Sequence, residues 1–320
     1  MRGSTRASGT ASVSDKPAAR LIPRVSSSSF VGPVPGDARH RWVPDLLRAA
    51  RRQPLGAIGA VVVALLLLTA LGAPWLAPHG PKDVGFAAYV PPGPEFPMGT
   101  DHLGRDVLSR VIWGARLSLW VGLASVAAGI TLGALWGLVA AYSGGASDLA
   151  SQRVVDSLMA LPPIVLALGL MAALGQSVNN VILALAILLA PTAARTVRSV
   201  ALGVQANPYI EAAQAVGCSH ARIVFRHILP NCLATYIVLV TTNVSYAIVV
   251  EAALSFLGAG APPDEPSWGG MLTAGTQSME HAPWLILFPG LAISLAVLAL
   301  NLLGDAIRDV TDPRLRGGLG

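Results

Sequence analysis

Six long apolar stretches, separated by polar segments, dominate the pattern of hydrophobic and polar positions along the 320 residues. Each is close to the roughly 20 mostly apolar residues that a helix needs to cross about 30 Å of hydrocarbon. Prolines or a carboxylate interrupt three of them, and proline is tolerated inside a span where neighbouring helices satisfy the freed carbonyl groups. We therefore predict an all-α polytopic membrane protein with about six transmembrane helices, over residues 55–77, 117–141, 157–175, 178–196, 233–256 and 284–303.

The distribution of Lys and Arg indicates how these helices are oriented. If the N-terminus is cytoplasmic, the cytoplasmic segments hold 18 of these residues and the external segments hold four. Cytoplasmic loops carry the excess of positive charge in membrane proteins, so we predict that both termini lie inside. All four external positive charges lie in a predicted external loop over 78–116, where Asp101 and Asp106 offset part of the charge of its three arginines.

Composition agrees with the membrane class. Hydrophobic residues make up 53% of the chain and charged residues only 12%, whereas soluble domains have about 25% charged residues. The net charge of +5 follows from the same positive-inside bias, so we expect no nucleic-acid partner. We predict a disordered cytoplasmic tail over 1–40, a basic cytoplasmic or interfacial segment over 41–54, and a membrane domain over 55–316.

The polar segment 205–231 lies between the fourth and fifth predicted spans, which places it in the cytoplasm. Asn207 is a good N-cap and Pro208 a good first-turn residue, whereas Gly217 is typical of the position after a helix C-terminus. We predict a short helix between them, with Glu211 near the positive end of the helix dipole. A helix of about 9 residues is marginal alone in water, so packing must hold it.

A second short helix is predicted after this glycine, with Ser219 as its N-cap and Leu229-Pro230 at its end. Two helices joined in this way also fit a DNA-reading helix-turn-helix, but the adjacent spans would keep the pair out of a major groove. The pair could instead rest its arginines on lipid phosphates or dock a soluble partner. Its apolar stripe, with i, i+3, i+4 and i+7 spacing, consists of Ala221, Val224, Phe225 and Ile228.

The sequence EAAQAVGCSHARIVFRHILPN, residues 211–231, resembles the EAA loop of permease subunits in bacterial ABC importers. That pattern is E-A-A, three residues, Gly, nine residues, then I-x-L-P, and His227 stands where the pattern has Ile. The resemblance implies that the short helix is a coupling helix seated in a groove of an ATPase subunit, whose ATP-driven closure moves the spans. The matching positions are Glu211, Ala212, Ala213, Gly217, Leu229 and Pro230.

Three further segments, over 98–119, 142–168 and 251–272, resemble the second permease subunit of importers for dipeptides, oligopeptides and, in some members, nickel. The resemblance covers roughly residues 50–316. It implies a type I ABC importer permease fold in the bacterial cytoplasmic membrane. It also implies a second homologous permease subunit, two cytoplasmic ATPases that bind ATP and Mg²⁺, and an external substrate-binding protein as partners, with no cofactor on this chain.

Glu251 lies near the outer end of the fifth predicted span. A carboxylate in hydrocarbon costs about 2.5–3.5 kcal/mol on insertion scales, so it should face protein, water or the interface. It could line a substrate path or pair with an arginine such as Arg105 or Arg110. The alternative is an interfacial, solvated carboxylate.

Motifs for catalysis or metal binding are missing from the sequence. It holds no G-x-x-x-x-G-K-[ST] and no H-E-x-x-H, and Cys218 and Cys232 lack metal-ligand spacing. Gly133 and Gly137 form a G-x-x-x-G pattern that predicts a close-packing helix face. We therefore expect a non-catalytic transport subunit. The alternatives are a membrane enzyme or scaffold whose inner segment only rests on lipid, and a secondary transporter, for which inverted repeats are not apparent.

Overall fold

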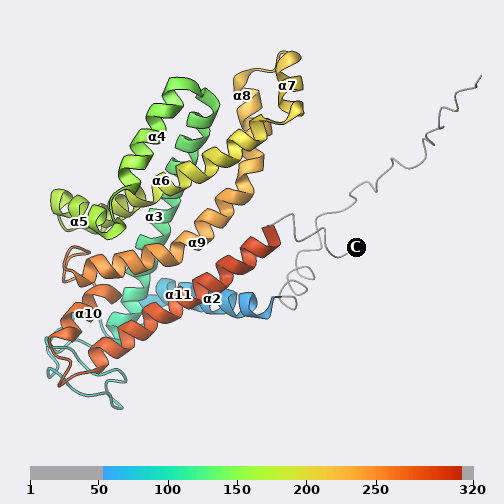
Figure 1. Cartoon of the computed structure of the whole chain (residues 1–320). Helices are drawn as coiled ribbons and strands as arrows, with labels where there is room; N and C mark the ends of the chain where they lie inside the picture. The colour runs from blue at the N-terminus through green and yellow to red at the C-terminus, as the bar shows by residue number, and fades with distance from the viewer. Residues whose placement is uncertain (1–52, 312–320) are drawn as a thin grey trace, which may run out of the picture. The chain divides into compact units, whose positions relative to one another are not determined.

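The computed structural model describes residues 53–311, which are helical apart from turns, loops and one isolated bridge between Thr100 and Asp106. All of them belong to one compact unit of the chain. In chain order the elements are α2 (Pro54–Leu76), α3 (Val107–Ser143), α4 (Gly145–Met159), α5 (Pro163–Leu174), α6 (Val178–Gln205), α7 (Pro208–Ala215), α8 (His220–Ile223), the π-helical turn η1 (Val224–Ile228), α9 (Leu229–Phe256), α10 (Trp268–Thr276) and α11 (Trp284–Thr311) (Figure 1).

Among the described residues, five helical segments are long and apolar enough to cross a membrane: α2, α3, α6, α11 and the continuous stretch His220–Phe256. The pair α4 and α5 also passes this test, but the two helices are bent by 92° at the break between them. The start of α2 lies beside the end of α11, because Gln53 Nε2 donates to Asp309 Oδ2 at 3.1 Å. Two ends at one membrane face require an even number of crossings, so α4 and α5 together count as the sixth.

The third predicted span, 157–175, is therefore not one straight helix. Pro162 and Pro163 lie at the break, where α4 has ended at Met159 and α5 begins. Proline cannot donate to the helical ladder and disfavours the helical conformation of the residue before it, so two in succession interrupt the helix. The single Pro191, in contrast, stays inside α6.

The two segments predicted to be external are more structured than the sequence predicts. The predicted loop over 78–116 ends at Asp106, whose side chain accepts hydrogen bonds from the backbone N–H groups of Leu108 and Ser109 and so caps α3. The segment after α9 contains α10, which the apolar pattern did not predict. The predicted tail over 1–40 and nearly all of the basic segment 41–54 lie outside the described residues.

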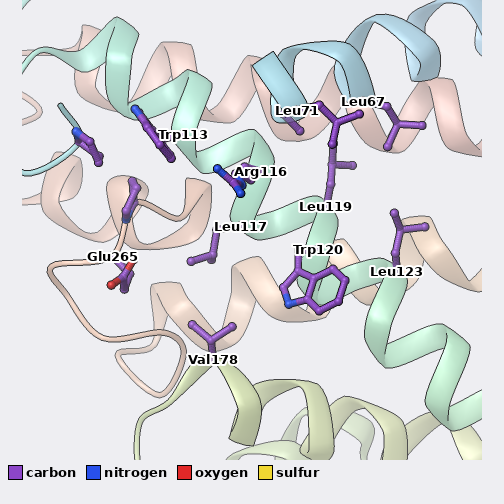
Figure 2. A pocket seen from close by; sticks show the side chains of 13 residues that line it. Leu67, Leu71, Trp113, Arg116, Leu117, Leu119, Trp120, Leu123, Val178 and Glu265 are labelled. Atoms are coloured by element: carbon purple, nitrogen blue, oxygen red, sulfur yellow. The ribbon is translucent and has the colours of Figure 1, made fainter. Parts of the chain in front are cut away.

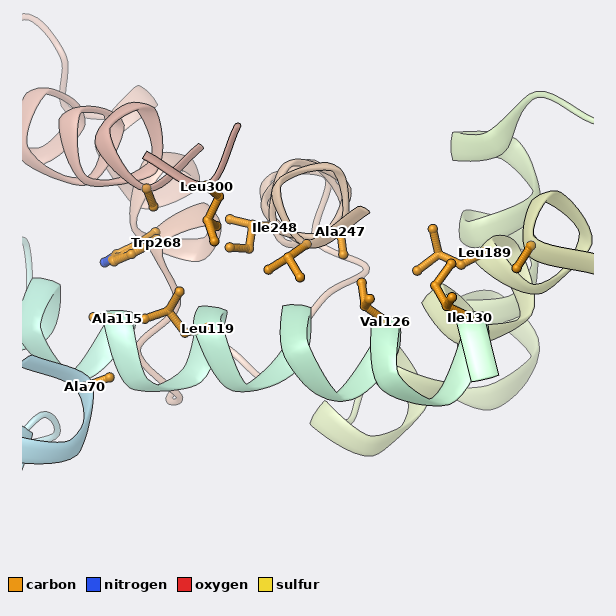
Figure 3. Packing of buried hydrophobic residues seen from close by; sticks show 13 residues of the cluster. Ala70, Ala115, Leu119, Val126, Ile130, Leu189, Ala247, Ile248, Trp268 and Leu300 are labelled. Carbon is orange, nitrogen blue, oxygen red and sulfur yellow. The ribbon is translucent and has the colours of Figure 1, made fainter. Parts of the chain in front are cut away.

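Close packing of α3 against α6 and α9 forms the centre of the bundle. A Cβ atom at Gly133 would lie 2.2 Å from the carbonyl oxygen of Ala190, and one at Gly137 would lie 2.1 Å from that of Ala194, so the predicted close-packing face is confirmed. Nearer the start of α3, buried side chains interlock with those of α9, α10 and α11 (Figure 3). They include Leu119, Val126, Ile130, Ala247, Ile248, Trp268 and Leu300.

The loops 77–106 and 257–283, with α10, form a structured region at the N-terminal end of α3, which we call the outer cap because the sequence predicts an external position for it. Tyr89 Oη lies 2.9 Å from Ser278 Oγ, and Trp284 Nε1 donates to the carbonyl oxygen of Thr100 at 3.2 Å. These contacts join the first loop to the segment before α11. The outer cap is thus a folded part of the domain.

Candidate functional site

The inner segment, residues 205–231, lies at the opposite end of α3 from the outer cap. Its first helix, α7, follows α6 after a short turn, and the first turn of α7 contains Glu211 as predicted. Asn207 occupies the N-cap position, but its side chain does not cap α7. Instead, its Nδ2 donates to the carbonyl oxygens of Gly203 and Val204, both at 3.0 Å. Asn207 is therefore the N-cap residue by position, as predicted, but the expected side-chain cap is not formed, because the side chain bonds the end of α6 instead.

Gly217 follows α7 in the left-handed conformation that the sequence predicts, with a φ of +80°. Its N–H donates to the carbonyl oxygen of Gln214 at 2.9 Å. No other part of the described chain comes within 4 Å of a Cβ atom built at this position. The glycine is therefore favoured by the backbone conformation and not by crowding.

A small apolar cluster anchors the two short helices to the bundle. Ile210 is the only buried residue of α7, with 2% exposure. It joins Ile223 and Ile228 of the second helix and the end residues Leu138 of α3 and Val197 of α6. The rest of α7 contributes no buried side chain, so most of its surface is left uncovered.

The second short helix does not end at Leu229-Pro230 as predicted. Ser219 caps α8 through a hydrogen bond from the backbone N–H of Arg222, as predicted. The helix then continues through η1 into α9, so that His220–Phe256 is one continuous stretch of 37 residues. Proline is tolerated in the first turn of a helix, and the π-helical turn before Pro230 already interrupts the regular bonding pattern.

The π-helical turn also changes which side chains face the bundle. Ile223 and Ile228 are 1% and 0% exposed, whereas Phe225 of the predicted stripe is 66% exposed and Ala221 is exposed as well. Residues five apart face the same side where hydrogen bonds run from i to i+5. The prediction, which assumed regular α-helical spacing, therefore assigned two of the four stripe positions to the wrong face.

The residues that match the EAA pattern lie on or beside the uncovered surface. Three exposed apolar side chains add to it: Phe225, which the sequence assigns to the packed stripe, is 66% exposed, and Val216 and Tyr209, for which the sequence predicts no role, are 80% and 45% exposed. Exposed large apolar side chains on one short segment are typical of an interaction surface. Of the predicted positions, Glu211, Ala212, Gly217 and Pro230 are exposed, and Ala213 and Leu229 are half-buried.

His227 packs within the inner segment. It is half-buried, and its ring centroid lies 6.2 Å from that of Tyr209 on α7. A second histidine, His220, has its Nδ1 2.5 Å from the hydroxyl oxygen of Tyr142 near the end of α3. Both histidines thus help to hold the short helices to each other and to the bundle.

Glu251 of α9 is buried, with 1% exposure, so the interfacial, solvated alternative is wrong. It accepts hydrogen bonds from Ser118 Oγ of α3 at 3.1 Å and from Ser255 Oγ at 2.8 Å. The suggested pairing with Arg105 or Arg110 is also not observed. These hydroxyl donors satisfy the carboxyl group within the bundle and link α3 to α9.

An apolar groove of about 650 Å³ lies along the outer half of α3, between α2 and the start of α6 (Figure 2). Leu117, Trp120 and Leu123 of α3 line it, and Arg116 and Glu265 supply its charged groups. Such a face suits lipid or an apolar partner more than a polar reaction. Within residues 53–311, no group of three or more His, Cys, Asp or Glu side chains could hold a metal ion.

The bundle of long apolar helices, with the short helices α7 and α8 at one end, defines a multi-pass integral membrane protein. Residues 129–317 match the family described as binding-protein-dependent transport system inner membrane component. Residues 43–92 match the family described as N-terminal TM domain of oligopeptide transport permease C. The chain therefore belongs to the family of ABC transporter permeases that form the inner-membrane component of binding-protein-dependent transport systems.

Several proteins of this family are similar over most of the chain. A Brucella suis protein provisionally named as a peptide transport system permease is 44% identical over 276 residues, which is 85% of this chain and 93% of the relative. The di/tripeptide transport system permease DppC of Pseudomonas aeruginosa is 41% identical over a match that spans 82% of this chain and 89% of the relative. The glutathione transport system permease GsiD of Escherichia coli is 41% identical over a match that spans 88% of this chain and 94% of the relative.

Proposed function

We propose that this chain is the permease subunit of an ATP-driven peptide importer and that α7 is its coupling helix. The observation that carries the coupling assignment is the uncovered surface of α7, which combines Glu211 with the apolar side chains of Val216 and Tyr209. The peptide cargo is supported by the relatives, which are named for peptide, di/tripeptide and glutathione transport. The predicted cytoplasmic position of the inner segment places this surface where an ATPase can reach it.

The geometry suggests how a displacement of α7 would reach the outer side. The second short helix continues into α9 as a stretch of 37 residues, which corresponds to about 55 Å at 1.5 Å per residue. At the far end of α9, α10 packs closely, because a Cβ atom at Gly269 would lie 2.4 Å from the carbonyl oxygen of Ala252. A rigid helix of this kind would carry a movement driven by ATPase closure toward α10.

The remaining partners follow from this assignment. A second homologous permease subunit would form the other half of the pathway, and an external binding protein would deliver the cargo. ATP and Mg²⁺ would be bound by the two ATPase subunits, while this chain makes and breaks no bond and carries no cofactor or metal. The surrounding lipid bilayer covers the apolar outer faces of the spans.

Two substitutions test the coupling assignment in the complete transporter, reconstituted in proteoliposomes with its binding protein. Gly217→Pro is incompatible with the φ of +80° and removes the donor to Gln214, and Glu211→Lys reverses the charge at the start of α7. We expect both variants to be inserted in the membrane but to lose peptide uptake and copurification of the ATPases. Normal uptake by both would falsify the assignment.

Matched controls separate coupling from general damage. Gly217→Asn keeps a residue that tolerates positive φ, and Glu280→Lys reverses an exposed charge at the other end of the domain; both should transport normally. The cargo is tested separately by the stimulation of ATP hydrolysis with a dipeptide, a longer peptide or nickel. Stimulation by nickel alone would contradict the peptide assignment but leave the coupling assignment standing.

A further inference from the structure

The outer cap contains a cavity with charged side chains in its lining that the coupling mechanism does not use. It has a volume of about 450 Å³ and is lined by α10, the segment after α9, the start of α3 and Gln176. Small-molecule sites usually occupy about 300–1,000 Å³, so this cavity, which we call the outer cavity, has room for a ligand the size of a short peptide.

The inner wall of the outer cavity is positively charged. Arg105 and Arg110 both line it although they are only 8% and 4% exposed. One carboxylate, Asp101, serves both of them: its Oδ2 is 2.6 Å from Arg105 Nε and 3.8 Å from Arg110 Nε. Arg110 NH1 also donates to the carbonyl oxygen of Pro81 at 3.0 Å. Two buried guanidinium groups against one carboxylate leave one positive charge and several N–H donors for a ligand.

The rim of the same cavity is negatively charged. Asp264 and Glu265 line it, and their side chains are 64% and 38% exposed. Lys82 Nζ lies 2.8 Å from Asp264 Oδ2 and 3.0 Å from Glu265 Oε1, so one ammonium group is shared by two carboxylates. The hydrogen bond from Lys82 lowers the pKa of Asp264, which keeps this carboxylate ionised. The rim therefore has one negative charge in excess.

A positive inner wall and a negative rim suit a ligand that carries opposite charges at its two ends. We propose that the outer cavity binds a peptide with free termini, with its carboxylate inward on Arg105 and Arg110 and its ammonium group outward toward Asp264 and Glu265. Guanidinium groups bind carboxylates through paired, charge-assisted hydrogen bonds. This assignment rests on the proposed peptide cargo and adds a site on the permease itself.

The test uses the assembled permease and ATPase complex in lipid nanodiscs without the binding protein, so that binding reports the permease alone. Labelled alanyl-alanine is displaced by unlabelled alanyl-alanine, by its C-terminal amide or by its N-acetyl derivative. Because each blocked terminus loses a charged hydrogen bond, we expect both derivatives to compete about tenfold less well or worse than the free dipeptide.

Variants should change this preference in a reciprocal way. Arg110→Gln should remove the preference for a free carboxylate and keep that for a free ammonium group. The double change Asp264→Asn, Glu265→Gln should do the reverse, and because both side chains are exposed we expect the fold to tolerate it. Glu280→Gln, an exposed acidic position outside the cavity lining, is the control and should leave both preferences unchanged.

The outcomes separate this assignment from the proposed function. If the wild-type complex binds the three compounds equally, or if the rim variant alters neither preference, the charged groups serve only to fold the outer cap and the assignment fails. That conclusion holds even where Arg110→Gln fails to assemble. If instead the complete transporter with its binding protein takes up no alanyl-alanine or other peptide, the proposed cargo itself is wrong.

Discussion

The outer cap and the inner segment differ in the burial of their charged side chains. In the outer cap and the first turn of α3, four charged residues are buried and contact one another or nearby backbone: Asp101, Arg105, Asp106 and Arg110, which are 5%, 8%, 2% and 4% exposed. In the inner segment, Glu211, Arg222 and Arg226 are exposed. Within residues 53–311, none of these three side chains makes an ion pair or hydrogen bond.

This difference indicates which end of the permease is held in shape by contacts of its own charged groups. A buried charge must be paired inside the chain, because an unpaired one costs several kcal/mol. An exposed charge is hydrated and can be transferred to a partner at small cost. The outer cap therefore depends on its own internal contacts for its shape, whereas the inner segment offers its groups to water or to a second protein. Four substitutions, taken in order of decreasing effect on stability, test this distinction.

Asp106→Ala should have the largest effect. Its carboxylate accepts from the backbone N–H groups of Leu108 and Ser109 and, at 2.5 Å, from Ser109 Oγ. Removal of the cap leaves buried donors unpaired, and we expect a loss of about 3 kcal/mol in stability. The thermal midpoint of the detergent-solubilised protein should fall clearly. Asp83→Ala, which removes an exposed carboxylate bonded to the Gly80 N–H, is the control; an equal fall there would argue against the buried network.

The outer cap is also where the sequence was least informative. Three arginines in a predicted external loop appeared to oppose the positive-inside rule, because charge counting does not show which charges are buried in pairs. The structure places Arg105 and Arg110 on Asp101, a contact that depends on the path of the whole loop. Only the N-cap role of Asp106 could have been predicted locally, from its position just before an apolar helix.

In the membrane bundle, prediction succeeded where one physical effect dominates. Long apolar runs define the spans because polar side chains are costly in hydrocarbon. The left-handed conformation of Gly217 follows from the local backbone preference of glycine. Prediction failed where two effects compete. The pair Pro162-Pro163 breaks a segment that is apolar enough to be one span, and the π-helical turn rotates Phe225 out of the stripe that regular spacing assigns to it. Neither the helix break nor the π-helical turn can be predicted from hydrophobic periodicity.

Arg198→Gln should have an intermediate effect. Arg198 of α6 donates from Nε and NH2 to the two oxygens of Asp148 of α4, at 2.6 and 2.5 Å, and both side chains are mostly buried. A forked pair of this kind contributes about 1 kcal/mol, so the thermal midpoint should fall less than for Asp106→Ala. Arg195→Gln removes a neighbouring but half-exposed pair with Asp156 and should cost less still. The reverse order would show that burial does not set the strength of these pairs.

Lys82→Met should change stability only slightly at neutral pH, because its pairs with Asp264 and Glu265 are solvent-exposed. Hydrogen bonds to these carboxylates raise the pKa of Lys82 above 10.5, and the hydrogen bond from Lys82 lowers the pKa of Asp264 below 3.8. The pair therefore makes its full contribution to stability between pH 3.8 and pH 10.5, where both partners are charged in the folded and the unfolded chain. This contribution is lost as the pH rises through the raised pKa of Lys82 or falls through the lowered pKa of Asp264.

The pH dependence of this pair is measurable by comparison of thermal midpoints. The difference between wild type and Lys82→Met should be small and constant from about pH 5 to pH 9, and should shrink only toward the two extremes. A difference that instead varies between pH 6 and pH 8 would mean that another titrating group, such as a histidine, controls the contact between the two loops.

Phe225→Ser should have the smallest effect on stability and a large effect on transport. Phe225 is 66% exposed, so its loss creates no cavity, whereas Ile223, two residues earlier and 1% exposed, belongs to the anchoring cluster. Ile223→Ser should therefore lower the thermal midpoint through a cavity and a buried hydroxyl, at a cost of about 3 kcal/mol. Phe225→Ser should melt like the wild type but lose about tenfold in ATPase copurification, as expected for an exposed aromatic anchor at an interface. If Phe225→Ser instead keeps full ATPase association and weakens only binding to vesicles, the inner segment rests on lipid and the contrast between the two ends of the molecule has another cause.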